Sequence, residues 1–197
     1  ENSDLLYQQI KNNLIVNTFY GIDYEPIQNS DGLLHSNLTD DLISHINSGV
    51  AMINYIGHGN YNTLADEKIL QLDRDINLIN SLDYKLPIWI VGTCSFGEYD
   101  GKNSMAEGLL LKNNGAIAII STVRGIGETS NINYLTKLFD KINDYLEDNN
   151  NYSRLGDIFK NSKNDSASED LFHLFGDPAL PLPFPKENDI IIDNIPN

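Results

Sequence analysis

The sequence predicts an α/β layer fold with a largely parallel central sheet. Three apolar runs, at 50–56, 87–93 and 115–122, have the length and composition of strands that are covered on both faces. Segments with helical spacing of apolar residues separate these runs and follow the last one. Strands that alternate with helices pair in parallel, because each helix returns the chain to the same end of the sheet. At 197 residues, the chain is long enough for one globular domain.

The first third of the chain is predicted to hold two strands with a helix between them. Leu14–Tyr20 is rich in β-branched and aromatic residues, which favours a strand. A helix is expected over Thr39–Ser48, where Thr39 has the side chain of an N-cap and Gly49 ends the helix. Val50–Ile56 is the first of the three buried strands.

The middle of the chain continues this alternation. Asp66–Leu82 has a mixed pattern and is expected to be helical in part. The second buried strand, Pro87–Thr93, is followed by helical spacing over Lys102–Asn114, and Gly115 stops that helix. Gly115–Thr122 is then the third buried strand.

After the third strand, the pattern predicts two helices and a closing segment. Asn131–Leu146 has the apolar spacing of a strong amphipathic helix, and Arg154–Asn161 is expected to form a short one. Residues 175–185 hold four of the seven prolines, which excludes a helix or a central strand there and favours a rigid closing segment. Asp189–Asp193 is predicted as an edge strand.

Composition excludes several classes of function. The chain has 28 acidic and 13 basic residues, which gives a formal net charge of −15. Such a surface repels nucleic acid and anionic lipid, and it favours solubility or a basic substrate. No apolar run reaches the roughly 18 residues of a membrane span, and the first residues lack the pattern of a signal peptide. One cysteine excludes an internal disulfide framework.

Two reactive side chains follow two of the predicted buried strands. His58 stands in the stretch NYIGHG, and Cys94, the sole cysteine, stands 36 residues later in GTCSFG. Because parallel strands present their carboxyl ends at one edge of a sheet, we expect His58 and Cys94 to share a cleft. A thiol beside an imidazole is the minimum requirement for cysteine catalysis. The amides of Gly59 and Cys94 are natural donors for an oxyanion.

Simpler interpretations of the same residues stay open. A lone cysteine is usually a small buried residue, and a histidine after a strand is often a hydrogen-bonded loop residue, which would leave a generic α/β binding domain. One cysteine and four scattered histidines lack the ligand spacing of a zinc site. Structural calcium near Glu98 and Asp100 is compatible with the acidic composition, although no twelve-residue calcium loop is present. Phosphate-loop and serine-hydrolase motifs are also absent from the sequence.

The two blocks resemble the catalytic blocks of the gingipain-type cysteine peptidases, a family in the same broad group as caspases and legumain. NYIGHG and GTCSFGEYD match in order and spacing. The resemblance continues through MAEGLLLKNNGAIAIISTVRGIGETSN and LFHLFGDPALPLPFP, and covers about Leu5 to Pro185. It implies a caspase-like three-layer sandwich that cleaves peptide bonds through a thioacyl intermediate and requires no cofactor. The last block is similar to the secretion-associated branch, the PorU-type C-terminal-signal sortases of the type IX secretion system.

The resemblance also assigns roles to individual residues. His58 matches the general base and Cys94 the nucleophile, and the amides of Gly59 and Cys94 match the oxyanion donors. Four residues are weaker candidates for the border of the substrate cleft: Thr122, Val123, Arg124 and Glu98. Among them, Arg124 can equally be an ordinary structural arginine.

For the whole protein, the resemblance sets further expectations. Residues 1–185 are expected to form a gingipain-like catalytic subdomain that lacks an upstream subdomain, and 186–197 a tail or the start of a β-rich region. The expected partners are protein or peptide substrates, an amine acceptor on a surface glycolipid and other secretion components, without nucleic acid. The expected location is the cell surface, in association with the outer membrane, or outside the cell. The alternatives are a secreted protease that only hydrolyses and a catalytically idle interaction domain.

Overall fold

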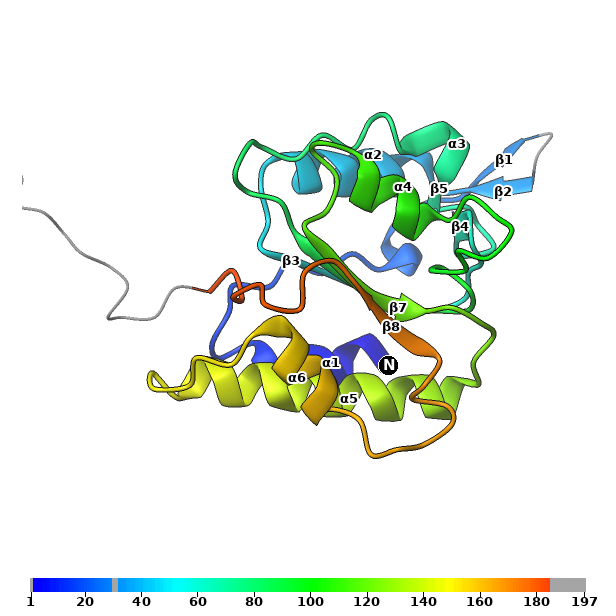
Figure 1. Cartoon of the computed structure of the whole chain (residues 1–197). Helices are drawn as coiled ribbons and strands as arrows, with labels where there is room; N and C mark the ends of the chain where they lie inside the picture. Colours follow the sequence, from blue (N-terminus) through cyan, green and yellow to red (C-terminus); the bar gives the residue numbers. More distant parts are fainter. Residues whose placement is uncertain (1, 30–31, 185–197) are drawn as a thin grey trace, which may run out of the picture.

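The computed structural model describes residues 2–29 and 32–184, which form three layers around a central sheet (Figure 1). The sheet has four strands in the order β3-β6-β7-β8, of which β3, β6 and β7 are parallel and β8 is antiparallel. These strands are β3 (Met52–Ile56), β6 (Ile88–Gly92), β7 (Ala118–Thr122) and β8 (Phe172–Phe175). The predicted α/β fold with a mainly parallel sheet is confirmed.

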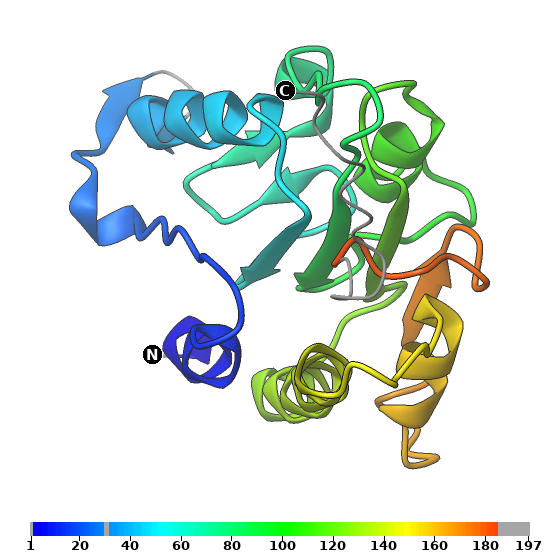
Figure 2. The same ribbon diagram turned by 90° about the vertical axis from the view of Figure 1, so that its left-hand side faces the viewer.

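Helices cover both faces of this sheet. One face carries α1 (Asn2–Ile10), α5 (Glu128–Glu147) and α6 (Leu155–Asn161), and the other carries α2 (Ser36–Asn47), α3 (Leu72–Asp75) and α4 (Met105–Leu111). Figure 2 shows α1 and α5 side by side under the sheet. Along β6, Ile88 and Ile90 face the core on the α5 side, whereas Trp89 and Val91 face the core on the α4 side. Side chains alternate between the faces of a strand, so two covered faces require a continuous apolar run.

The remaining elements are short. A hairpin of β1 (Ile27–Asn29) and β2 (Gly32–Leu34), a second of β4 (Thr63–Leu64) and β5 (Leu70–Gln71), and the 3₁₀ helix η1 (Gly21–Asp23) lie outside the main sheet. No helix within the described residues is long and apolar enough to cross a membrane.

The predicted strand at Leu14–Tyr20 is wrong. This segment follows α1 as irregular chain, and it belongs to none of the ladders between described strands. Leu14 and Val16 pack against the core on the α5 side, while Ile15 is 98% exposed. The β-propensity of such residues reflects packing on a half-buried surface, and it does not supply a strand to pair with.

Two details of helix α2 and strand β3 also differ from the prediction. Helix α2 begins at Ser36, so Thr39 is not its N-cap; Thr39 is buried, and its hydroxyl donates to the carbonyl of Ile69 (2.7 Å). Gly49 follows the helix with φ +93°, as its assignment as a stop requires. Strand β3 packs against the cores on both faces of the sheet, as predicted, but it is only half-buried because it is an edge strand.

The chain returns to the sheet once more than the sequence predicted. Phe172–Phe175 forms β8, which was not predicted, and His173 lies in this strand. The segment after it packs on α6, where the amides of Leu155 and Gly156 donate to the carbonyls of Leu180 and Pro178 (both 2.9 Å). This agrees with a rigid closing segment. The predicted strand at 189–193 and the proposed tail at 186–197 lie outside the described residues.

Candidate active site

Strands β3 and β6 leave the sheet side by side at the same edge. Their register pairs Ile56 with Gly92, so His58 and Cys94 each stand two residues beyond the same pair. The amide of Gly57 donates to the carbonyl of Gly92 (3.2 Å), which extends the pairing past the end of β3. The expectation that the two strands are neighbours is confirmed, and their order places both reactive residues at one edge of the sheet.

The backbone at His58 is fixed while the residue itself is exposed. Its carbonyl accepts hydrogen bonds from the Tyr55 hydroxyl (2.7 Å) and from the amide of Ala65 (2.9 Å). Burial raises the pKa of Tyr55, and the Glu67 carboxylate raises it further, so the hydroxyl stays protonated and can donate. The imidazole is therefore presented to solvent from a loop that is held by its main chain.

Gly59 lies where the chains that follow β3 and β6 approach each other closely. A Cβ at this position would come within 2.8 Å of both the Thr63 carbonyl oxygen and the Thr93 hydroxyl oxygen. A glycine is therefore needed for the loop after His58 to pack against the residue that precedes Cys94.

Cys94 is half-buried, and its thiol contacts the loop between β7 and α5. The amide of Ile126 lies 3.5 Å from Sγ as a donor, and the carbonyl of Ile126 lies 3.6 Å from Sγ as an acceptor. The next residue, Ser95, has φ +56°, a conformation that is uncommon for residues other than glycine. Its amide donates to the carbonyl of Arg124 (3.1 Å), which stabilises the sharp turn after the thiol.

The two proposed oxyanion donors are the amides of Gly59 and Cys94. In the described part of the chain, neither the Gly59 N–H nor the Cys94 N–H donates to a protein acceptor. Both belong to the same sheet edge, since the Gly59 loop packs against Thr93. Free amides at a turn beside a thiol are the arrangement that stabilises a developing oxyanion.

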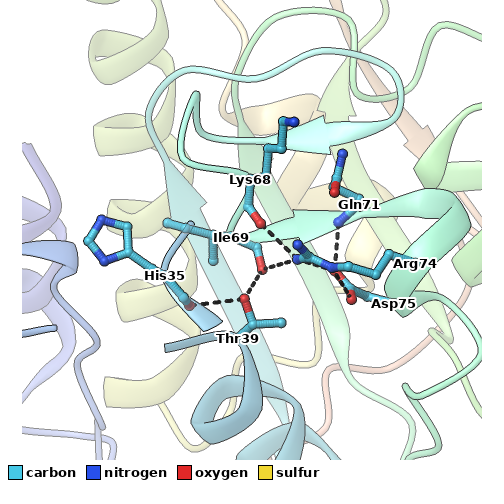
Figure 3. A network of polar contacts seen from close by, with 7 residues as sticks. All are labelled: His35, Thr39, Lys68, Ile69, Gln71, Arg74 and Asp75. Carbon is cyan, nitrogen blue, oxygen red and sulfur yellow. Dashed lines mark hydrogen bonds and ion pairs between the residues drawn. The ribbon is translucent and has the colours of Figure 1, made fainter. Parts of the chain in front are cut away.

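A polar network behind the β4–β5 hairpin supports the His58 loop (Figure 3). The buried Asp75 carboxylate accepts from the amide of Gln71 (2.8 Å) and from the Arg74 guanidinium (2.6 and 2.7 Å). Arg74 also donates to the carbonyls of Lys68 and Ile69, and the latter accepts from Thr39. Because β5 pairs with β4, which is bridged to Gly59, this network holds the hairpin that follows the histidine.

The carbonyl groups at the end of β6 bind side chains from neighbouring elements. The Val91 carbonyl accepts from Ser121 Oγ (2.7 Å), the Gly92 carbonyl from Asn131 Nδ2 (2.8 Å), and the Thr93 carbonyl from Thr122 Oγ1. These three donors lie on β7 and α5. They fix the last residues before Cys94 from two sides.

The weaker cleft candidates occupy different environments. Thr122 and Val123 are 0% and 7% exposed, so Thr122 offers no surface to a substrate and Val123 very little. Arg124 forms a two-armed ion pair with Asp100 (2.9 and 2.5 Å), and these hydrogen bonds hold the pKa of Asp100 below its usual value. Glu98 pairs with Lys102 at 3.3 Å. Their roles in substrate binding remain predictions.

An aromatic group beside this edge was not found from the sequence. Tyr99 contacts the rings of His173 and Phe175, with centroids 5.9 and 6.0 Å apart. Burial lowers the pKa of His173, and the positive charges of Lys163 and Arg124 lower it further. The sequence offered no signal for this group, because β8 brings His173 and Phe175 next to Tyr99 from a distant part of the chain.

The most marked hollows of the described residues lie away from His58 and Cys94. One lies beside Tyr145 and Phe184 and the other between α6 and β8, and neither is lined by His58 or Cys94. The described residues also contain no group of three or more His, Cys, Asp or Glu side chains that could hold a metal ion.

Comparison with known proteins identifies the family. The model of peptidase family C25 matches residues 2–183. The chain belongs to peptidase family C25. This confirms the resemblance to the gingipain-type cysteine peptidases. No curated protein sequence gives a significant match.

Solved structures of similar fold agree with membership of family C25. The Arg-specific cysteine proteinase gingipain R (RgpB) matches with a TM-score of 0.72 and 16% identity over 92% of this chain. The complex of the RgpB pro- and mature domains from Porphyromonas gingivalis matches with a TM-score of 0.70 and 16% identity, also over 92%. A third structure, described as a protease, matches with a TM-score of 0.58 and 18% identity over 71%. The chain spans 42%, 43% and 37% of those three chains, respectively.

Proposed function

We propose that this chain is the part of a C25 cysteine peptidase that carries the catalytic dyad, with Cys94 as the nucleophile and His58 as the general base and acid. The observation that carries the proposal is the register of β3 and β6, which sets both residues two positions beyond the Ile56–Gly92 pair. The free amides of Gly59 and Cys94 at the same edge complete the chemistry that acyl transfer requires.

The reaction follows from these positions. His58 accepts the proton of the Cys94 thiol, Sγ adds to the carbonyl carbon of the scissile bond, and the amides of Gly59 and Cys94 donate to the resulting oxyanion. The C–N bond then breaks, His58 gives a proton to the departing amine, and the acyl group remains as a thioester on Cys94. Water or a second amine attacks this thioester, His58 accepts the proton of the attacking group, and the thiol is released.

The charge of the chain favours basic protein or peptide substrates. A net charge of −15 attracts Lys- and Arg-rich segments and raises their rate of encounter. We further propose that the protein acts at the cell surface or outside the cell, and that catalysis needs no cofactor, since every step uses side chains and amides of the chain. Calcium would have a structural effect only.

The group that accepts the acyl chain separates two forms of the proposal. The block FGDPAL favours a type IX secretion sortase, in which an amine on a surface glycolipid is the acceptor. In the fold, Pro178 and Leu180 of this block accept hydrogen bonds from the start of α6, which gives the block a structural role as well. A secreted protease that uses water is therefore the alternative, and the reaction product distinguishes them: a free carboxyl end or an amide to an added amine such as glycinamide.

The first experiment measures the reactivity of the thiol. Cys94 is the only cysteine, so any iodoacetamide adduct on the intact chain belongs to it. We expect alkylation of the folded protein near pH 6 to be at least about tenfold faster than that of the chain unfolded in urea, because an imidazolium partner favours the thiolate. His58→Ala should remove this advantage, and His45→Ala, on α2, should not.

Peptide cleavage completes the test. Cys94→Ala should abolish turnover of basic peptides and leave the melting temperature nearly unchanged, because the thiol makes few contacts. A folded protein whose thiol reacts no faster than the unfolded chain, with or without His58, would show that the dyad is not formed and would support an idle interaction domain.

A further inference from the structure

Asn131 occupies a buried position at the junction of the two loops that carry His58 and Cys94. It lies in the first turn of α5 and is 5% exposed. Its Nδ2 donates to the carbonyl of Gly92 over 2.8 Å, and the same carbonyl accepts the amide of Gly57 over 3.2 Å. One carbonyl oxygen therefore joins the chain before Cys94, the chain before His58 and helix α5.

The packing at this junction depends on the absence of a side chain on Gly92. A Cβ there would lie 2.4 Å from Leu135 Cδ1 and 2.7 Å from Asn131 Oδ1. Helix α5 consequently rests directly on the last residue of β6. Leu135, one turn further along the helix, packs against Gly92 in the same way, with an apolar side chain.

The other end of the Asn131 amide is its side-chain oxygen, Oδ1. This oxygen is buried and accepts no hydrogen bond from the described residues. A buried polar atom without a partner destabilises a fold, and stability alone would favour a leucine here, as at Leu135. Unsatisfied polar groups that persist in a fold are expected at functional sites. The amide is therefore explained by the hydrogen bond that it donates to Gly92.

We propose that Asn131 is a positioning residue, which fixes His58, Cys94 and the start of α5 relative to one another through the Gly92 carbonyl. It touches neither the thiol nor the imidazole in this role. The inference rests on the proposed function, because the arrangement matters only if Cys94 and His58 react as a pair.

The start of α5 connects this junction to the thiol itself. The loop residue Ile126, two residues before Glu128 opens α5, makes both backbone contacts to Sγ. Because Asn131 binds the first turn of α5 to the end of β6, it also holds Ile126 against Cys94. A displacement of about 1 Å in such an arrangement can lower a rate by roughly 100-fold.

The test compares two leucine variants of the full chain. Asn131→Leu removes the donor together with the unpaired Oδ1, and the Gly92 carbonyl keeps the Gly57 amide as a donor, so stability should change little. Asn133→Leu is the matched control, since Asn133 lies two residues further on α5 and is exposed. The readouts are the iodoacetamide rate at Cys94 across pH 5 to 9 and the melting temperature, each with and without His58→Ala.

We expect Asn131→Leu to slow alkylation by roughly 10- to 100-fold, to abolish its dependence on His58, and to leave the melting temperature near that of Asn133→Leu. Asn131→Asp, which keeps the shape but loses the donor when ionised, should also slow alkylation near pH 8. Two results would overturn the inference. One is a thiol in Asn131→Leu that stays as reactive and as dependent on His58 as in Asn133→Leu. The other is a large fall in the melting temperature of Asn131→Leu, which would make the role of Asn131 structural. A wild-type thiol that ignores His58 would contradict the proposed function as well, so the two failures are distinguishable.

Discussion

At the scale of residues, two pairs of arginine and aspartate show how burial changes the importance of one interaction. Arg124 and Asp100 form a two-armed pair in which both side chains are about half exposed. Arg74 and Asp75 form a similar pair, but the Asp75 side chain is only 3% exposed and also accepts the Gln71 amide. Water can replace the partner of the exposed Asp100 carboxylate, whereas the Asp75 carboxylate is shielded from water and depends on its protein donors.

Replacing the buried aspartate should therefore be far more damaging. Asp75→Asn places an amide against two donors, and we expect it to lower the free energy of unfolding by about 3 kcal/mol. In a domain of this size the melting temperature would fall by roughly 6–12 °C. Thermal melts followed by circular dichroism measure this, and Asp100→Asn is the control that should melt close to the wild type. Equal melting temperatures for the two variants would contradict the role assigned to the network in Figure 3.

At the scale of elements, the contact of α5 with β6 organises the molecule. Helix α5 has 20 residues and buries Leu135, Leu138 and Phe139 against the sheet, and it approaches the end of β6 at Gly92. Protein interiors are close-packed, so an added methyl group at such a contact must displace the helix or the strand.

Two glycine substitutions test this contact. Gly92→Ala should lower the free energy of unfolding by about 1–3 kcal/mol through overpacking against Leu135 and Asn131. Gly125→Ala, in the loop before α5, meets no atom within 4 Å and should leave stability unchanged or slightly increased. Urea unfolding at neutral pH gives both values. If Gly92→Ala were as stable as Gly125→Ala, the helix would not be in the tight contact described.

At the scale of the whole molecule, the charge balance makes the few well-placed ion pairs important. Acidic residues outnumber basic residues by 28 to 13, so repulsion between negative charges destabilises the folded state at neutral pH. Glu169, 4% exposed, pairs with Lys137 of α5 and accepts the amide of Asn164 (2.5 Å). Burial alone would raise the pKa of Glu169, but Lys137 and the backbone donors outweigh burial and lower it.

The sign of the pH dependence follows from this lowered pKa. In the unfolded chain, Glu169 has its ordinary pKa of 4.5, so the folded chain binds fewer protons at Glu169 than the unfolded chain does. The contribution of the Glu169 charge to the stability of the fold is therefore complete above pH 4.5. It is lost as the pH falls through the folded pKa. We expect Glu169→Gln to melt below the wild type at pH 7 and the difference to disappear under acid, measured by melts over a pH series. A difference that is constant with pH would mean that the charge of Glu169 is irrelevant.

Much of the fold was predictable because the strongest sequence signals are those of buried elements. The apolar runs at 87–93 and 115–122 became the two central strands, and the periodic segment at 131–146 became α5. The failures fall at the edges of the sheet. Leu14–Tyr20 has strand composition without a partner, and Phe172–Phe175 pairs with β7 although the prolines that follow mask its signal.

For the candidate site, the sequence predicted the reactive pair but not the contacts that support it. Because His58 and Cys94 each follow an apolar strand, their residue types and spacing were enough to predict a shared edge, and the order of β3 and β6 confirms that the strands are neighbours. Tyr55, Ile126 and Asn131 could not be predicted in this way. Each acts through a hydrogen bond whose geometry depends on how a loop or helix packs.

The sequence by itself determined the α/β layering and the family, and it led to the proposal of His58 and Cys94 as the reactive pair, because burial on both faces of a strand and glycine beside a reactive side chain leave local signals. Only the tertiary structure decided that β8 closes the sheet, that the Ile126 backbone meets the thiol, and that Asn131 reaches Gly92. The two hydrogen bonds join residues 32 and 39 positions apart, and the pairs of the β7–β8 ladder join residues 50 to 56 positions apart. The reason is physical: a local pattern fixes which face of an element is buried, whereas a long-range hydrogen bond exists only after two elements have packed in one register.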